Sequence, residues 1–320
     1  MKWSYSLHTA MRRCQLQLVF GHRFASHNAR DPERREAYVL KQLQHVSAWQ
    51  GHVVHHVMAT DFLSAVTRGD PIDPTVLTTA SVALARRQFA FSGAKRYREP
   101  GQTKSAAGEE YSALFAHEYG WPADSEVLDQ VEMNLARCFA NLAAQPEFLD
   151  QLRAGSRYAA ELPLNIRLDG VTVAATPDLV FIRSNGQPTI VDWKIAQSET
   201  SDYSRQLLVY ALVVSRCGRW PGVRPDEIEL IEANLLKNEI RRHPVSAQSL
   251  DDTEDFIYRS VIELKTLMED VNPAVLDLAD FDVAEQPSTC LYCGFRGICV
   301  RWLDAAGTLE ATAAVQGRLW

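Results

Sequence analysis

Hydrophobic residues recur at intervals of three and four through the first half of the chain, which is the spacing of one face of an α-helix. The pattern runs through residues 51–66, 74–91 and 125–149, and we predict helices there. Residues 95–110 are polar and contain one proline and two glycines, which is typical of an exposed loop.

The period changes to two after residue 156, which indicates β-strands. We predict strands at residues 158–168, 171–182, 189–195 and 227–236, a strand-like partner at 239–245, and helices at 204–216 and 252–268. This order predicts an α/β fold with a mixed central sheet flanked by helices. The expected divisions are an N-terminal helical segment (1–50), a helical region (51–155), a core (156–270) and a C-terminal cysteine segment with an Ala- and Gly-rich tail (271–320).

Composition narrows the class of protein. The 320 residues are 46% hydrophobic and 23% charged, which is ordinary for a globular protein. No apolar run approaches the roughly 18 residues of a membrane span, and the N-terminus lacks an apolar signal segment, so we expect a cytoplasmic protein. The net charge of −7 weakens a nucleic-acid hypothesis without excluding it, because residues 1–50 form a locally basic region.

The strongest chemical signal lies in two neighbouring predicted strands. Asp178 opens one apolar run, and Asp192 and Lys194 interrupt the next. Alternation places Asp192 and Lys194 on one face, and the Asn-Gly turn within residues 184–187 would bring Asp178 beside them. Burying these charges is costly unless they bind something charged. The alternative, a turn residue and a surface ion pair, conflicts with the apolar flanks, so we predict a Mg²⁺ site.

Two further groups are ambiguous from spacing alone. Gln206 and Tyr210 lie at i and i+4, so they share a helix face, although half-buried polar residues are the commoner interpretation in isolation. His52, His55 and His56 compete as ligands in one predicted helix, although a structural role is the commoner one for a lone helical histidine.

Six cysteines in a cytoplasmic protein indicate thiols or metal ligands. Cys290, Cys293 and Cys299 have x2 and x5 spacing, and Cys14 could supply a fourth thiolate. Zn²⁺ and an iron–sulfur cluster both accept such ligands, and both remain candidates. The other two cysteines, Cys138 and Cys217, lie in apolar helical patterns that predict simple packing.

Taken in order, these motifs resemble the PD-(D/E)XK nucleases of the RecB type that carry a four-cysteine [4Fe–4S] cluster, such as AddB-like and small CRISPR-associated RecB-like exonucleases. The matching residues are Trp3-Ser4-Tyr5-Ser6 with Cys14, Gly51 and His55, Pro177-Asp178, Asp192 and Lys194, Gln206 and Tyr210, and Cys290, Cys293 and Cys299. Two departures are Gln15, where the family commonly has proline, and Ala175, where glycine is common.

The resemblance implies a restriction-endonuclease-like core, a helical N-terminal insertion, and a cysteine-ligated cluster that joins the two termini. It also implies a site in which Mg²⁺ or Mn²⁺ is held by His55, Asp178, Asp192, the Trp193 carbonyl and Glu161. Gln206 and Tyr210 would then steady the scissile strand or Lys194. Zn²⁺ remains the alternative occupant of the four cysteines.

The implied function is metal-dependent hydrolysis of DNA, as an exonuclease acting on ends or single strands. The expected partners are DNA and, as a second candidate, a helicase or another nucleic-acid-processing protein, since no Gly-x4-Gly-Lys motif is present in this chain. The competing hypothesis is a catalytically silent subunit with a nuclease fold that binds DNA or protein in a repair, CRISPR or defence complex. We expect the helical insertion at about residues 60–155 to set substrate access.

Overall fold

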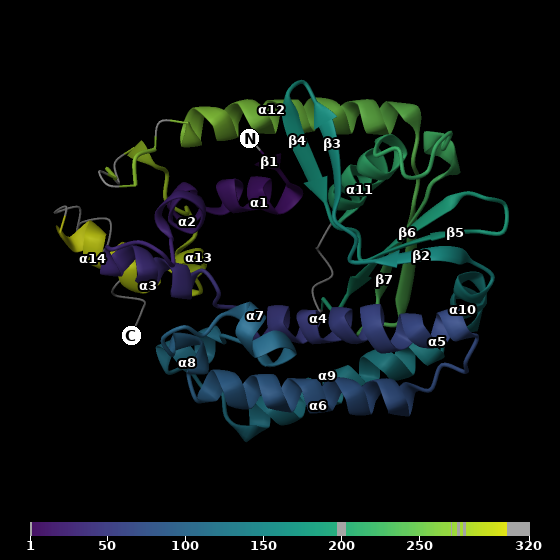
Figure 1. The fold of residues 1–320 in the computed structure, drawn as a ribbon, viewed down its shortest axis with the longest axis horizontal. Helices are drawn as coiled ribbons and strands as arrows, with labels where there is room; N and C mark the ends of the chain where they lie inside the picture. The colour runs from purple at the N-terminus through teal and green to yellow at the C-terminus, as the bar shows by residue number, and fades with distance from the viewer. Residues whose placement is uncertain (1, 197–202, 270, 274–275, 278–279, 306–320) are drawn as a thin grey trace.

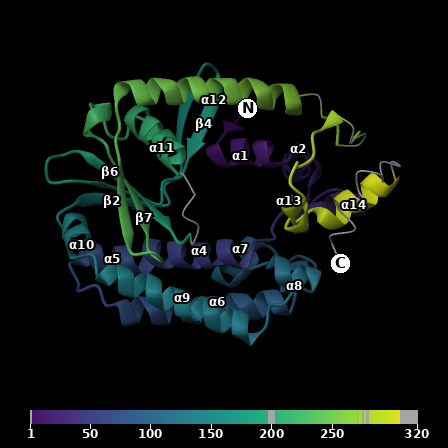
Figure 2. The ribbon, with the colours of Figure 1, turned by 180° about the vertical axis from the view of Figure 1, so that it is seen from behind.

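The computed structural model describes residues 2–196, 203–269, 271–273, 276–277 and 280–305. A five-stranded sheet lies between a layer of long helices and a second layer made of two helices and a three-stranded sheet (Figure 1). The C-terminal segment lies at one end, beside helices that follow the N-terminus in the sequence, and the view from behind shows the same arrangement (Figure 2). None of the described helices is long and apolar enough to cross a membrane.

The five-stranded sheet is the centre of the fold and confirms the predicted mixed α/β class. Its strands, in spatial order, are β2 (Ser156–Ala160), β5 (Leu179–Ile182), β6 (Pro188–Lys194), β7 (Glu229–Asn234) and β8 (Glu239–His243). Strands β6 and β7 are parallel and the other pairs are antiparallel. Successive residues enter opposite hydrophobic clusters: Phe181 and Ile231 pack against one helical layer, and Val180 and Leu230 pack against the other.

Helices from the first half of the chain cover one face of this sheet (Figure 1). They are α4 (Val46–Val57), α5 (Leu63–Arg68), α6 (Pro74–Gly93), α9 (Ser125–Ala143) and α10 (Pro146–Arg153). A π-helical turn, Met58–Phe62, joins α4 to α5 within the predicted helix at 51–66. The helix predicted at 125–149 is in fact two helices, because Pro146 lacks the N–H that continuation requires and instead begins α10.

The opposite face is covered by α11 (Ser204–Arg216), α12 (Ala247–Met268) and the small sheet of β1 (Lys2–Trp3), β4 (Val171–Ala175) and β3 (Leu164–Leu168). Helix α11 has the predicted bounds. Helix α12 begins five residues before the predicted start, because Ser246 and Ser249 cap its N-terminus reciprocally.

The strands predicted at 158–168 and 171–182 are wrong in extent, because each divides between the two sheets. The first becomes β2 and β3, and the second becomes β4 and β5. Prolines at positions 163 and 177 remove ladder donors at the two breaks. Strands β3 and β4 form their own hairpin, with Asp169 and Gly170 both at positive φ in a two-residue turn.

The predicted hairpin between Asp178 and Asp192 is confirmed. Strands β5 and β6 are antiparallel, and Leu179 pairs with Val191. The backbone N–H of Gly186 donates to the Arg183 carbonyl at 2.9 Å, and Gly186 has φ of 84°. The turn therefore uses glycine for its left-handed residue, as an Asn-Gly sequence predicts.

Helix α1 (Tyr5–Arg13) packs beside α12, where Arg12 pairs with Glu263. The two ends of the chain meet through α2 (Gln15–Val19), α3 (Pro32–Leu40), α13 (Pro287–Leu291) and α14 (Arg296–Ala305) (Figures 1 and 2). Leu16 and Phe20 share a buried cluster with Phe295 and Ile298. The departure from family pattern at Gln15 has a local reason, because its amide donates to Asp282 at 3.0 Å and accepts from the Asp282 N–H at 2.9 Å. The tail beyond residue 305 lies outside the described residues.

The predicted loop at 95–110 contains short helical turns. They are Arg96–Arg98, α7 (Lys104–Ala107) and Gly108–Glu110, and α8 (Phe115–Tyr119) follows shortly after.

Candidate metal centre

Three acids meet at one edge of the large sheet because of strand order. Glu161 directly follows β2, Asp178 directly precedes β5, and Asp192 lies near the end of β6. Antiparallel pairing sets the end of β2 beside the start of β5, where the Glu161 N–H donates to the Asp178 carbonyl at 3.0 Å. The Asp178 carboxylate accepts from the Trp193 N–H at 2.7 Å, which fixes it against β6.

Asp192 and Lys194 project from the same face of β6, as the period of two predicted. The Lys194 ammonium lies 2.5 Å from the Asp192 carboxylate, and their side chains are only 14% and 1% exposed. The ammonium also donates to the Gln206 carbonyl oxygen at 3.3 Å, and the Gln206 amide donates to the Tyr210 hydroxyl at 2.8 Å. Helix α11 thus orients the ammonium through the predicted i,i+4 pair.

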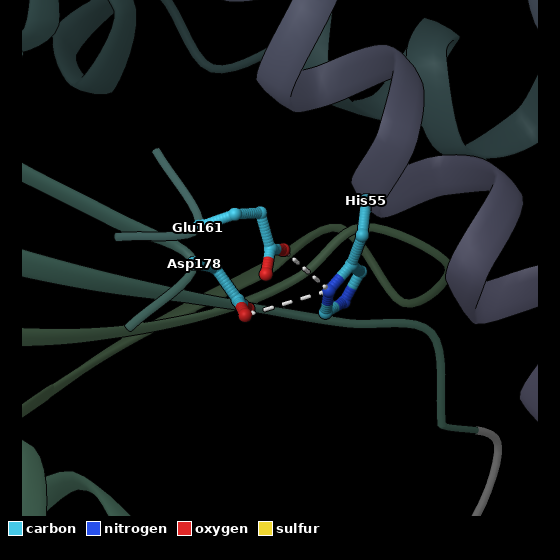
Figure 3. A group of neighbouring side chains, drawn as sticks. All are labelled: His55, Glu161 and Asp178. Atoms are coloured by element: carbon cyan, nitrogen blue, oxygen red, sulfur yellow. Dashed lines mark ion pairs between the residues drawn. The ribbon is translucent and has the colours of Figure 1, made fainter. Parts of the chain in front are cut away.

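His55 is the histidine that reaches the acids (Figure 3). Its Nδ1 lies 3.4 Å from Asp178 and 3.5 Å from Glu161, and its Nε2 lies 3.0 Å from the Trp193 carbonyl oxygen. The other two histidines of α4 have partners elsewhere: His52 contacts Gln44 and His56 contacts Glu109. The face of α4 that packs against the sheet determines which of the three histidines lies near the acids.

Burial controls the protonation of the acids. It raises the pKa of Asp178 to about 7, and the nearby Asp192 charge adds to the effect. Burial also raises the pKa of Asp192, although the Lys194 charge opposes it. Burial lowers the pKa of His55, but the hydrogen bond to Glu161 and the Asp178 charge outweigh it, so the net shift is upward. The nearby positive charges of Lys194 and His55 therefore do not offset the cost of burying the Asp178 and Asp192 carboxylates.

The donor set suits a hard divalent cation. One ligand atom from each of His55, Glu161 and Asp178 lies within 4.8 Å of the others. Asp192 is next to this group and paired with Lys194, and the Trp193 carbonyl adds a further oxygen on the His55 side. Carboxylate and carbonyl oxygens with one imidazole are ligands that Mg²⁺ and Mn²⁺ accept.

A sequence model of the PD-(D/E)XK nuclease superfamily matches residues 2–300 of the chain. The chain belongs to the PD-(D/E)XK nuclease superfamily. The superfamily name describes a Pro-Asp pair followed by an acid, any residue and a lysine. The chain has these residues in that order, as Pro177-Asp178 and Asp192-Trp193-Lys194. Superfamily membership indicates a nuclease-type hydrolase of phosphodiester bonds that acts on nucleic acid, and such nucleases typically use divalent metals.

No match is found among curated proteins. Among solved structures, the chain is similar to one titled "Crystal structure of SSO0001", with 14% sequence identity and a TM-score of 0.30. That match covers 68% of this chain and 93% of the other. A likeness of this size adds nothing to the superfamily assignment.

The structure brings the four predicted cysteine ligands into one neighbourhood. Burial, together with the charges of neighbouring cysteines such as Cys14, raises the pKa of Cys293 and of Cys299 to about 12. Cys290 is affected in the same way by Cys14. Among the described residues, no three of these sulfurs lie within 4.8 Å of one another. Cys138 is buried in the helical core, as predicted.

Two features of this site were not found from the sequence. Glu161 adopts φ of 47°, a left-handed conformation that is uncommon outside glycine and costs about 1–3 kcal/mol. The Lys194 ammonium also lies 4.4 Å from the centroid of the Tyr203 ring. The only sequence signal for Tyr203 is an aromatic residue just before a helix, which is too common to be specific.

Proposed function

We propose that this superfamily member is a Mg²⁺- or Mn²⁺-dependent deoxyribonuclease that acts on single strands or free DNA ends. The convergence of Asp178, Asp192 and Glu161 with His55 at one sheet edge carries the proposal. A catalytically silent subunit has no need for buried acids whose pKa values are raised, since each such charge costs stability. The net charge of −7 remains the one feature in favour of the silent alternative.

The proposed roles follow from the contacts. His55, Glu161, Asp178, Asp192 and the Trp193 carbonyl would hold the cation, which supplies charge stabilisation at the scissile phosphate and lowers the pKa of water. Lys194 places a positive charge next to Asp192, where it favours a deprotonated water and stabilises negative charge on phosphate oxygens.

Helix α11 supports this arrangement. Gln206 holds the Lys194 ammonium with its carbonyl oxygen, and Tyr210 in turn accepts from the Gln206 amide. We propose that these two residues position Lys194.

A cleavage assay on end-labelled DNA tests the function. We expect the wild-type protein to degrade linear single-stranded DNA with Mn²⁺ and to be inactive in EDTA. A circular single strand of the same length distinguishes cleavage from ends, which leaves the circle intact, from internal cleavage, which linearises it. Isothermal titration with Mn²⁺ separates the alternatives, because a silent subunit without a metal site would take up no ion specifically.

We further propose that Cys14, Cys290, Cys293 and Cys299 bind a [4Fe–4S] cluster that links the two ends of the chain. Cys14, Cys293 and Cys299 pack against the same buried hydrophobic cluster, which joins the two ends of the chain, and four thiolates are the ligand set of a [4Fe–4S] cluster.

Anaerobically purified protein should therefore contain iron and sulfide and absorb visible light, and Cys293→Ser should lose this absorbance. The matched control, Cys138→Ser, should retain it, because Cys138 lies in the helical core. Colourless protein with stoichiometric zinc would contradict the proposal.

A further inference from the structure

A cavity of about 980 Å³ opens directly beside the proposed metal centre. It lies between α4, α9 and the end of β6, and it shares His55, Trp193 and Lys194 with that centre. Its volume is at the upper end of the range for small-molecule sites, so a nucleoside fits within it. Most of its surface is apolar, which suits the face of a flat ring.

Three residues of the cavity lining are joined into a chain by hydrogen bonds between their side-chain amides. Gln130 is exposed and donates to Asn134 at 3.1 Å, and Asn134 donates to Gln50 at 3.2 Å. Gln50 is only 5% exposed, and its Nε2 has no hydrogen-bond partner among the described residues. Reversing all three amides would leave an unpaired carbonyl oxygen at Gln50 in place of the unpaired N–H.

An unpaired buried amide costs about 1–3 kcal/mol, so a partner for Gln50 would be favourable. In either orientation of the three amides, one polar atom of the Gln50 side chain stays unpaired: an N–H in one and a carbonyl oxygen in the other. Gln50 can therefore offer either a donor or an acceptor. The edges of nucleobases present both kinds of group.

The charges around the cavity disfavour a phosphate within it. Asp124 and Glu126 lie at its rim, at the start of α9, where Asp124 already accepts from the helix N–H groups. His52 also lines the cavity, and its Nδ1 lies 2.6 Å from the Gln44 side-chain oxygen. The only lysine of the described lining, Lys194, is paired with Asp192. The occupant should therefore be uncharged.

A second cavity of about 410 Å³ adjoins the first at His52, and the acid in its described lining, Glu109, is paired with His56. Lys41 and Lys104 both line it, and burial together with the Lys104 charge lowers the pKa of Lys41. Two lysines that repel each other form a site for an anion, and the DNA backbone provides one at every nucleotide.

We infer that the large cavity binds an unpaired nucleobase of single-stranded DNA next to the scissile phosphate, with Gln50 as a positioning residue, while Lys41 and Lys104 contact a phosphate of the same strand. The inference rests on the proposed nuclease function and specifies its substrate. A base that enters this cavity cannot be paired, so duplex DNA must be opened or frayed before it binds.

The test is a binding measurement in EDTA, so that cleavage does not interfere. Fluorescence anisotropy compares three labelled DNAs: a short single strand, the same strand with abasic nucleotides, and a duplex. We expect the wild-type protein to bind the intact strand about tenfold more tightly than the abasic strand. Gln50→Leu should lose most of this difference, and Gln248→Leu, a matched change on the exposed face of α12, should keep it.

Two further variants keep the test decisive. Gln130→Leu changes an exposed residue, which folding tolerates, and it should weaken the preference for the intact strand in the same direction. Lys41→Gln should instead weaken binding of intact and abasic strands equally and reduce the salt dependence. Equal affinity of wild-type protein for intact and abasic strands would overturn the inference, as would tighter binding of the duplex.

This outcome is separate from that of the nuclease proposal. Base-dependent binding without any Mn²⁺-dependent cleavage would sustain the cavity and defeat the proposed catalysis. Cleavage that is indifferent to the missing bases would defeat the cavity and leave the nuclease proposal standing.

Discussion

Replacing Asp178 with asparagine should stabilise the metal-free protein while destroying its metal site. The Asp178 pKa is raised from 3.8 to about 7, and the side chain is 8% exposed. Between these pH values the folded protein keeps a proton that the unfolded chain has lost, so stability falls as the pH rises through this window. A shift of about three pKa units corresponds to about 4 kcal/mol above pH 7.

Asparagine removes this cost and keeps the structural contact. Its carbonyl oxygen can still accept from the Trp193 N–H, as Asp178 does at 2.7 Å. We therefore expect Asp178→Asn to be more stable than wild type by up to about 4 kcal/mol at pH 8, and by about 2 kcal/mol at pH 5.5, where less of the window has been crossed. The exposed control Asp251→Asn should change stability by less than about 0.5 kcal/mol.

Urea unfolding in EDTA at both pH values measures these differences. A repeat with Mn²⁺ at about 100 times its dissociation constant should stabilise the wild-type protein by about 2.7 kcal/mol and the variant hardly at all. An Asp178→Asn protein less stable than wild type at pH 8 in EDTA would refute the electrostatic argument.

Two other substitutions probe the site and the junction of the termini. Lys194→Gln leaves the buried Asp192 charge without its ammonium, so DNA cleavage should fall by about 100-fold or more, and undiminished cleavage would exclude Lys194 from the chemistry. Gly294→Ala places a methyl group 2.8 Å from the Leu40 carbonyl oxygen and should lower stability by about 1–3 kcal/mol in thermal unfolding, whereas Gly297→Ala meets only ordinary contacts and should be nearly neutral.

Local patterns predicted the parts of the site that lie close in the sequence. The period of two placed Asp192 and Lys194 on one face, and the Asn-Gly turn placed Asp178 beside them, because both depend only on backbone geometry. The i,i+4 rule likewise paired Gln206 with Tyr210. These contacts need no knowledge of the rest of the fold.

Other features depend on long-range packing and were not predictable in this way. Alternation continues across residues 158–168, yet Pro163 divides them between two sheets, and periodicity cannot show to which sheet a strand belongs. The choice of His55 depends on which face of α4 meets the sheet, and here only the family resemblance selected it. The amide chain that ends at Gln50 joins two helices whose contact the sequence does not encode locally.

The central claim is that the acids at the edge of the large sheet hold a divalent cation for DNA hydrolysis. The most direct measurement is Mn²⁺-dependent cleavage of end-labelled single-stranded DNA by Asp192→Asn beside the wild-type protein, with folding checked by circular dichroism. The account predicts that the folded variant has no detectable activity. Wild-type rates of metal-dependent cleavage in that variant would contradict it.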